Sequence, residues 1–193
     1  MIASATQQAA ARARVNAVLV GLWAFIGSEA IFFGSLIASY LYLRIRAGEW
    51  PPAGVPQLEI ILPLFNTVVL LSSGVTMHGA HMSARSGDVD GLRQGTLATI
   101  LLGAAFLCGQ AYEYATAGFG LGSGLLGSTF FTLTGFHGAH VLVGLIGLTL
   151  LYSRARRGHY QAGLEYPSIE GVTLYWHFVD AVWVVLLTLL YLI

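Results

Sequence analysis

Ionisable side chains inside long apolar stretches are the first candidates for chemistry in this sequence, because placing a charge in hydrocarbon is costly. One carboxyl stands alone, and the other residues form pairs spaced three apart: Glu29; His137 and His140; His177 and Asp180; Gln110 and Glu113. On an α-helix, residues three apart lie on the same face. A helical bundle could therefore bring these carboxyls and imidazoles together around one interior site.

The histidines allow two interpretations. Three imidazoles on two helices could hold a metal or a haem, since neutral imidazole is the commonest metal ligand. In the other interpretation they belong to a hydrogen-bonded network, in which His177 and Asp180 stabilise each other and Glu29 pairs with an imidazole or a hydroxyl. Spacing favours the network, because no other apolar stretch supplies a histidine at mid-depth.

Glu29 lies near the middle of the first apolar stretch. A carboxyl at that depth is either part of a proton relay or a regulatory group, or it is a structural carboxyl that is hydrogen-bonded inside the bundle. Both interpretations stay open. Nearer a membrane surface we expect His81, Arg85 and Trp176, which fit an interface with water, lipid headgroups or a partner; a metal site at His81 and the neighbouring His78 is the weaker interpretation.

The elements that must position these residues are five long apolar stretches. A bilayer core about 30 Å thick needs roughly 20 mostly apolar residues per helix, and five stretches meet that requirement: 15–46, 59–84, 92–117, 126–154 and 170–193. They are separated by a proline-rich segment, a polar turn, a glycine-rich loop and a longer polar connection: 50–56, 86–91, 118–124 and 154–168. We therefore predict an all-α integral membrane bundle of five transmembrane helices, forming a single domain over 1–193.

Composition supports a membrane protein. Of the 193 residues, 56% are hydrophobic and 9% are charged, whereas a soluble domain carries about 25% charged residues. The mean hydropathy is +0.72. Nine acidic residues balance nine basic ones, so charge indicates no nucleic-acid partner. Cys108 is the only cysteine, which excludes a disulfide, a CxxC metal site or a CxxCH haem attachment within the chain.

The arginines predict the orientation. Seven fall on the N-terminal side of the predicted spans, and Arg44 and Arg46 fall on the other side: Arg12, Arg14, Arg85, Arg93, Arg154, Arg156 and Arg157. Because cytoplasmic loops carry the excess of positive charge, the N-terminus is expected in the cytoplasm and the C-terminus outside. All nine basic residues are arginine, which favours a GC-rich bacterial genome and hence the bacterial inner membrane.

The motifs around these residues resemble the subunit III family of haem–copper oxidases. The matching segments occur in family order and cover nearly all of 15–193: S-E-A-I-F-F at 28–33, N-T at 66–67, S-G-V-T at 73–76, A-H at 80–81, Q-A-Y-E-Y at 110–114, G-S-T-F-F at 127–131, T-G-F-H-G-A-H-V at 134–141 and W-H-F-V-D at 176–180. Any one of them is a weak signal. The last two, in sequence, are highly specific.

The resemblance implies a non-catalytic subunit of a proton-pumping terminal oxidase that reduces dioxygen in aerobic respiration. Such a subunit docks mainly on subunit I, beside subunit II, and steadies subunit I, binds phospholipid and supports proton uptake. The family member holds no haem or copper, which lie in partner subunits, so no metal site is expected here. Glu29 matches the family's membrane-buried carboxylate, which reacts with hydrophobic carbodiimides. His137, His140, His177, Asp180 and Glu113 match motif positions that carry no redox role.

The chain departs from the longer family members, which have seven helices, by lacking the first two. An extended subunit I can supply them, and the lipid-holding cleft that they border is in doubt for this chain alone. The alternatives are subunit III of a quinol oxidase and an accessory subunit of nitric oxide reductase; Phe178 and the complete 134–141 motif favour the oxidase. An independent transporter built around Glu29 is disfavoured because no inverted repeat is evident. The electron donor, the lipid species, the stoichiometry and membership of a larger respiratory assembly are left open.

Overall fold

The computed structural model describes residues 2–48, 50, 59–160 and 166–193, with residues 2–16 described as backbone only. Over these ranges the chain is helical and has no strand. The elements are α1 (Ile2–Arg46), α2 (Ile61–Ser86), α3 (Val89–Thr116), α4 (Gly124–Arg156) and α5 (Pro167–Leu187), which continues as the π-helical turn η1 (Thr188–Leu192). All five helices are long and apolar enough to cross a membrane. The predicted all-α bundle of five spans is confirmed.

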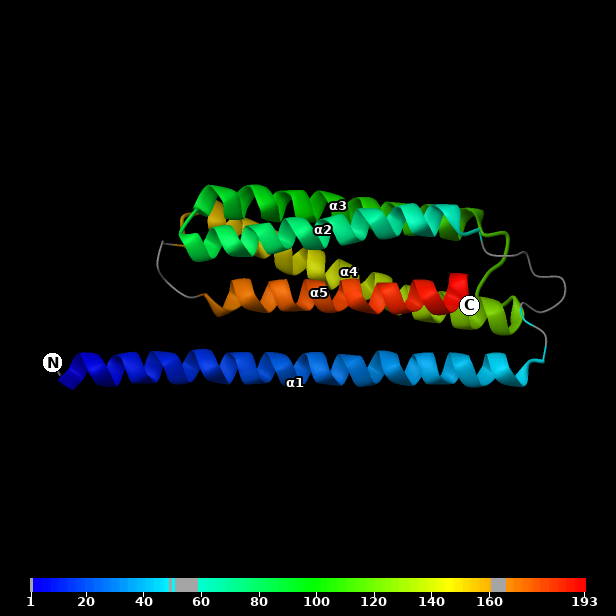
Figure 1. Cartoon of the computed structure of the whole chain (residues 1–193), viewed down its shortest axis with the longest axis horizontal. Coiled ribbons are helices and arrows are strands. Elements are labelled where there is room, and N and C mark those ends of the chain that lie inside the picture. Colours follow the sequence, from blue (N-terminus) through cyan, green and yellow to red (C-terminus); the bar gives the residue numbers. More distant parts are fainter. Residues whose placement is uncertain (1, 49, 51–58, 161–165) are drawn as a thin grey trace.

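Successive helices run in opposite directions (Figure 1). Helices α2 and α3 pack most extensively, and α4 and α5 complete a four-helix body with them. Helix α1 lies alongside α5 and α4, and its N-terminal part extends beyond the ends of the other helices (Figure 1). In its most apolar part only 11% of the residues are buried, against 44% for α5. Most of the α1 surface therefore faces away from the chain.

The helix ends follow local chemistry. Helix α2 ends at Gly87, whose φ of +83° places it in the left-handed region that favours glycine. Asp88 then caps α3, its carboxylate accepting from the Gly91 N–H at 2.9 Å. The predicted polar turn at 86–91 is therefore shorter than expected, because α3 already begins at Val89.

Other boundaries differ from the predicted ones. Helix α1 begins at Ile2 rather than near residue 15, because the alanine-rich segment before the apolar stretch consists of good helix formers. Helix α5 begins at Pro167 rather than near residue 170, since proline suits the first turn of a helix. The proline-rich connection at 51–58 and residues 161–165 of the last connection lie outside the described residues.

Small residues allow α2 and α3 to approach closely. A β-carbon added to Gly95 would lie 2.8 Å from that of Ala80 and 3.0 Å from the carbonyl oxygen of Thr76. One turn further, the hydroxyls of Thr76 and Thr99 lie 2.8 Å apart across the same interface. The α2–α3 pair therefore combines backbone approach with an interhelical hydrogen bond, as is common in membrane helices.

Candidate functional site

Glu29 and His140 join α1 to α4. Oε2 of Glu29 lies 2.9 Å from Nε2 of His140, and the two side chains are only 20% and 17% exposed. Nδ1 of the imidazole lies 2.6 Å from the carbonyl oxygen of Phe136. The rings of Phe32 and Phe33 pack on the imidazole, with centroids 6.2 and 4.9 Å away.

These contacts fix the number of protons that Glu29 and His140 share. The Phe136 carbonyl can only accept, so Nδ1 must carry a proton. The bond at Nε2 then needs one more proton, which either the carboxyl or the imidazole holds. In both arrangements the pair has no net charge, which reduces the cost of placing it inside a membrane.

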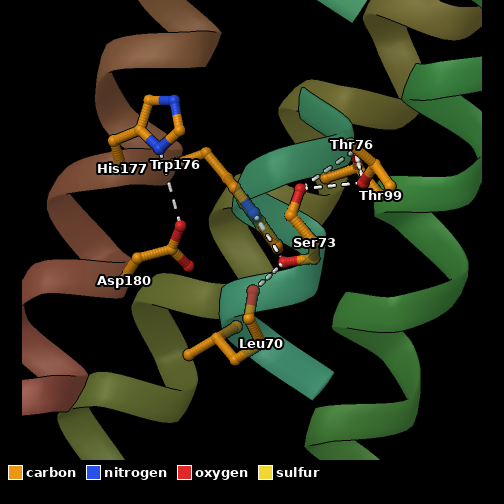
Figure 2. Close-up of polar contacts among 7 residues, drawn as sticks. All are labelled: Leu70, Ser73, Thr76, Thr99, Trp176, His177 and Asp180. Carbon is orange, nitrogen blue, oxygen red and sulfur yellow. Dashed lines mark hydrogen bonds and ion pairs between the residues drawn. The ribbon is translucent and has the colours of Figure 1, made fainter. Parts of the chain in front are cut away.

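His177 and Asp180 form a second pair on α5. Nδ1 of His177 lies 3.6 Å from Oδ2 of Asp180 (Figure 2). Asp180 packs against α2 at Gly74, where an added β-carbon would lie 2.4 Å from Oδ2. Its side chain is 9% exposed and that of His177 is 41% exposed, and the His78 ring centroid lies 6.5 Å from that of His177. The network interpretation expected these two residues to pair, and the structure places them next to each other; their mutual stabilisation stays a prediction.

Trp176 lies inside the bundle, and its predicted place at an interface is wrong. The ring is 0% exposed, and its Nε1 donates to Oγ of Ser73 at 2.9 Å (Figure 2). Gly103 and Gly144 flank the ring, and a β-carbon on either would lie within 2.8 Å of it. The indole fits in the core because the two glycines leave room for it and a hydroxyl satisfies its N–H.

Trp183 repeats this arrangement two turns later. It is also 0% exposed, and its Nε1 donates to Oγ1 of Thr67 on α2 at 2.8 Å. Both rings tie α5 to α2 through hydroxyl groups of the N-T and S-G motifs.

His137 is separate from both pairs. It is 1% exposed and neither ring nitrogen has a hydrogen-bond partner among the described residues. Its ring packs against those of Phe106 and Trp183, with centroid distances of 5.8 and 5.0 Å. The prediction of one shared interior site is therefore wrong, because His137 points into the α3–α5 core while His140 points toward α1.

Glu113 lies in a third set of contacts near the α3–α4 end of the bundle. It accepts from Nε2 of Gln110 and from the hydroxyl of Tyr191, each at 2.8 Å. The neighbouring Tyr114 shares a hydrogen bond of 2.7 Å with Thr134 on α4. These bonds link three helices at a place where the sequence indicated only an i,i+3 pair.

The other two predicted site residues, His81 and Arg85, lie near the C-terminal end of α2. His81 is half-buried and Arg85 is exposed in the last turn of α2, so an interfacial role for them stays a prediction. In the part of the chain that the structure describes, no group of three His, Cys, Asp or Glu residues is placed to hold a metal ion.

Sequence reasoning missed a contact between α1 and the end of α5. The Tyr40 hydroxyl donates to the Leu189 carbonyl at 3.0 Å, and Arg44 donates to the same oxygen at 3.1 Å. Arg44 also lies over the Trp50 ring, 5.8 Å from its centroid. The available signal was the i,i+4 spacing of Tyr40 and Arg44, together with a basic residue near the end of a helix.

An apolar groove of about 220 Å³ lies between α1, α4 and α5. It opens to the surface and is lined from α1 by Leu22 and Phe25, with Val143, Gly147 and Val172 opposite. Because Gly147 has no side chain, this part of the groove stays open.

Comparison with known proteins agrees with these motifs. The family model described as cytochrome c oxidase subunit III matches residues 1–193. The chain is 40% identical over 176 residues to cytochrome c oxidase subunit 3 of Thermostichus vulcanus, covering 91% of this chain and 87% of the relative. It is 41% identical over 184 residues to the probable cytochrome c oxidase subunit 3 of Mycobacterium leprae, covering 93% and 90%. Identity to cytochrome c oxidase subunit 3 of Loxodonta africana is 39% over 177 residues, covering 89% of this chain and 67% of the relative. The five spans, the ordered motifs and these matches agree that the chain belongs to the cytochrome c oxidase subunit III family.

Proposed function

We propose that this chain is the non-catalytic subunit III of a proton-pumping cytochrome c oxidase in a bacterial inner membrane. Family membership makes it a multi-pass membrane subunit of an oxidoreductase complex. The observation that supports a non-catalytic role is how the mid-membrane histidines are used: His140 pairs with Glu29, His177 pairs with Asp180, and His137 is enclosed by aromatic rings. Haem and copper then belong to partner subunits.

Subunit I is the proposed main partner, with subunit II beside it. The support is the exposed face of α1, which carries Trp23, Ile31 and Tyr42, exposed by 61, 73 and 63%. Large apolar side chains need a covering of lipid or protein. Phospholipid is the proposed occupant of the groove beside Leu22 and Phe25, because an acyl chain matches an apolar lining.

Glu29 is proposed to tune proton uptake or the durability of turnover rather than electron transfer. The support is its contact with the His140 imidazole, a group that can bind or release a proton. The arginine distribution supports an N-terminus in the cytoplasm and a C-terminus outside.

The test is purification of the complex from native membranes through a tag on this chain, followed by its optical spectrum and identification of its companions. We expect a haem-a-type spectrum, subunits I and II, and no haem on this chain after dissociation. The composition of subunit II would identify the electron donor. A chain that purifies alone, or that keeps its own haem, would overturn the proposal.

A further inference from the structure

Buried polar atoms without partners gather in the half of the four-helix body nearest the α3–α4 turn. They are Nδ2 of Asn66, Oε1 of Gln110 and both ring nitrogens of His137, none of which makes a hydrogen bond within the described residues. The three side chains are 3, 4 and 1% exposed. They come from three different helices, α2, α3 and α4. A further unpaired atom, Oδ1 of Asp180, belongs to the carboxylate that packs against Gly74.

Aromatic contacts place His137 in this region. Its ring packs against the rings of Phe106 and Trp183. Those two rings also pack against each other, with centroids 4.8 Å apart. Gln110 follows Phe106 by one helical turn on α3. Gln110 therefore lies one helical turn from the Phe106 ring that His137 contacts.

Asn66 joins the same region from α2. Its amide packs on α3 beside Gln110, since a β-carbon on Gly109 would lie 2.2 Å from Oδ1 and 2.4 Å from Nδ2. The next residue, Thr67, accepts the indole N–H of Trp183. Three helices thus present unpaired polar atoms around one pair of aromatic rings.

The chemistry of these atoms identifies the ligand. Buried polar groups in proteins nearly always have a hydrogen-bond partner. Here Nδ2 of Asn66 can only donate and Oε1 of Gln110 can only accept, while a neutral imidazole does one of each. A cation would not suit the amide donor, and an anion would not suit the amide oxygen. We propose that Asn66, Gln110 and His137 form an internal water-binding site, because water is small and both donates and accepts.

Hydrogen bonds connect the site to the α3–α4 end of the bundle. Nε2 of Gln110 donates to Glu113, which in turn accepts from Tyr191 near the α3–α4 end. In the other direction the interior is filled by Leu70, Met77 and Trp176, all 0% exposed. We therefore expect water to exchange through the α3–α4 end.

Radiolytic hydroxyl labelling of the intact oxidase tests the proposal. Short X-ray pulses produce hydroxyl radicals from bound water, so buried side chains that touch internal water become oxidised. Trp183 and Trp176 form a matched pair, since both are 0% exposed and both donate to a hydroxyl. We expect Trp183 to be oxidised at least several-fold faster than Trp176, with ¹⁸O uptake from labelled water that lags behind that of the exposed Trp23.

Variants connect the labelling to His137. His137→Phe keeps a ring but removes both nitrogens, and it is expected to lower Trp183 oxidation to the rate of Trp176. His140→Phe is the control, because His140 contacts Glu29 and not this region; Trp183 oxidation should be unchanged in it. Equal rates for the two tryptophans in the wild-type oxidase, or undiminished Trp183 oxidation in His137→Phe, would overturn the proposal. If a variant fails to assemble, the wild-type comparison decides alone.

Discussion

At the scale of single residues, the contact between Glu29 and His140 is one polar tie between α1 and the rest of the bundle. The Phe136 carbonyl holds the imidazole so that Nε2 faces the carboxyl. The contact needs one proton between two groups, and either group can hold it. An amide at position 29 can also satisfy this geometry, since its NH₂ donates to an unprotonated Nε2.

The loss of stability on replacing Glu29 should therefore depend on whether the new side chain can donate a hydrogen bond. Glu29→Gln keeps a donor and is expected to cost under about 1 kcal/mol, whereas Glu29→Ala leaves Nε2 unpaired and should cost about 1–3 kcal/mol. Thermal unfolding of the subunit within the purified oxidase measures the difference. Haem content should stay intact in both variants, and Glu29→Gln should change only proton uptake or turnover durability. Equal destabilisation by Gln and Ala would contradict the shared-proton geometry.

Trp176 offers a second test at this scale. A β-carbon on Gly144 would lie 2.8 Å from its ring, and the ring has little freedom to move because Ser73 and Gly103 hold it from the other sides. Gly144→Ala should destabilise the subunit by about 1–3 kcal/mol through overpacking.

The matched control is Gly138→Ala in the same helix. The β-carbon would there meet only an atom of Leu107, at 3.9 Å, and alanine favours a helix over glycine by about 1 kcal/mol. We expect unchanged or slightly raised stability, measured by the same thermal unfolding. Equal stability of the Gly144→Ala and Gly138→Ala variants would show that the Trp176 ring can shift to make room for the added β-carbon.

Residue spacing predicted these sites only in part. It anticipated that His177 lies next to Asp180 and that Glu29 meets an imidazole. It could not separate His137 from His140, because i,i+3 spacing places two residues on one broad face without saying which neighbouring helix each meets. It also misplaced Trp176, because the glycines that accommodate the ring come from two other helices, α3 and α4.

At the scale of elements, α1 is attached to the rest of the chain at a few points. Glu29 holds it to α4 at mid-depth, and Tyr40 with Arg44 holds it to the end of α5. The Leu189 carbonyl lies in η1, at the helix end where backbone acceptors lack intrahelical partners. Arg44 therefore caps α5 from a different helix.

Removal of this cap should loosen the end of α5. Arg44→Gln is expected to cost about 1.5–3 kcal/mol, the usual range for a hydrogen bond to a charged group. Hydrogen exchange of the intact oxidase should show faster exchange of the η1 amides. Arg46→Gln, two residues later, is the control and should leave exchange in η1 unchanged; faster exchange in both variants would point to a general effect of charge rather than to the cap.

At the scale of the whole molecule, the five-helix architecture was predictable because membrane thickness sets the length of a span. The number of helices and their order needed only apolar stretches and the polar turns between them. The early start of α1 at Ile2 was not predicted, because the apolar signal begins later than the helix does. The position of α1 beside α4 and α5 could not be predicted either, since it depends on contacts between residues far apart in the chain.

The predicted orientation can be tested with single cysteines. After Cys108→Ala removes the native thiol, Ser86→Cys in the α2–α3 turn should react with an impermeant maleimide only from the cytoplasmic side. Leu121→Cys, at a position 63% exposed in the α3–α4 connection, should react only from outside. Intact cells expose the outer side to the maleimide and inverted vesicles expose the cytoplasmic side, so labelling in both preparations shows on which side each cysteine lies. The reverse pattern would overturn the orientation drawn from the arginines.

The sparse attachment of α1 has a consequence for biosynthesis. Helix α1 is translated first, whereas α4 and α5, which it contacts, are translated last. Until α4 enters the membrane, Glu29 lacks the imidazole with which it shares a proton in the finished fold. We therefore expect an insertase or an assembly factor to shelter the first helix during this interval. A ribosome-stalled chain that ends before α4 should crosslink to such a factor through α1, and the crosslink should disappear once His140 has been inserted.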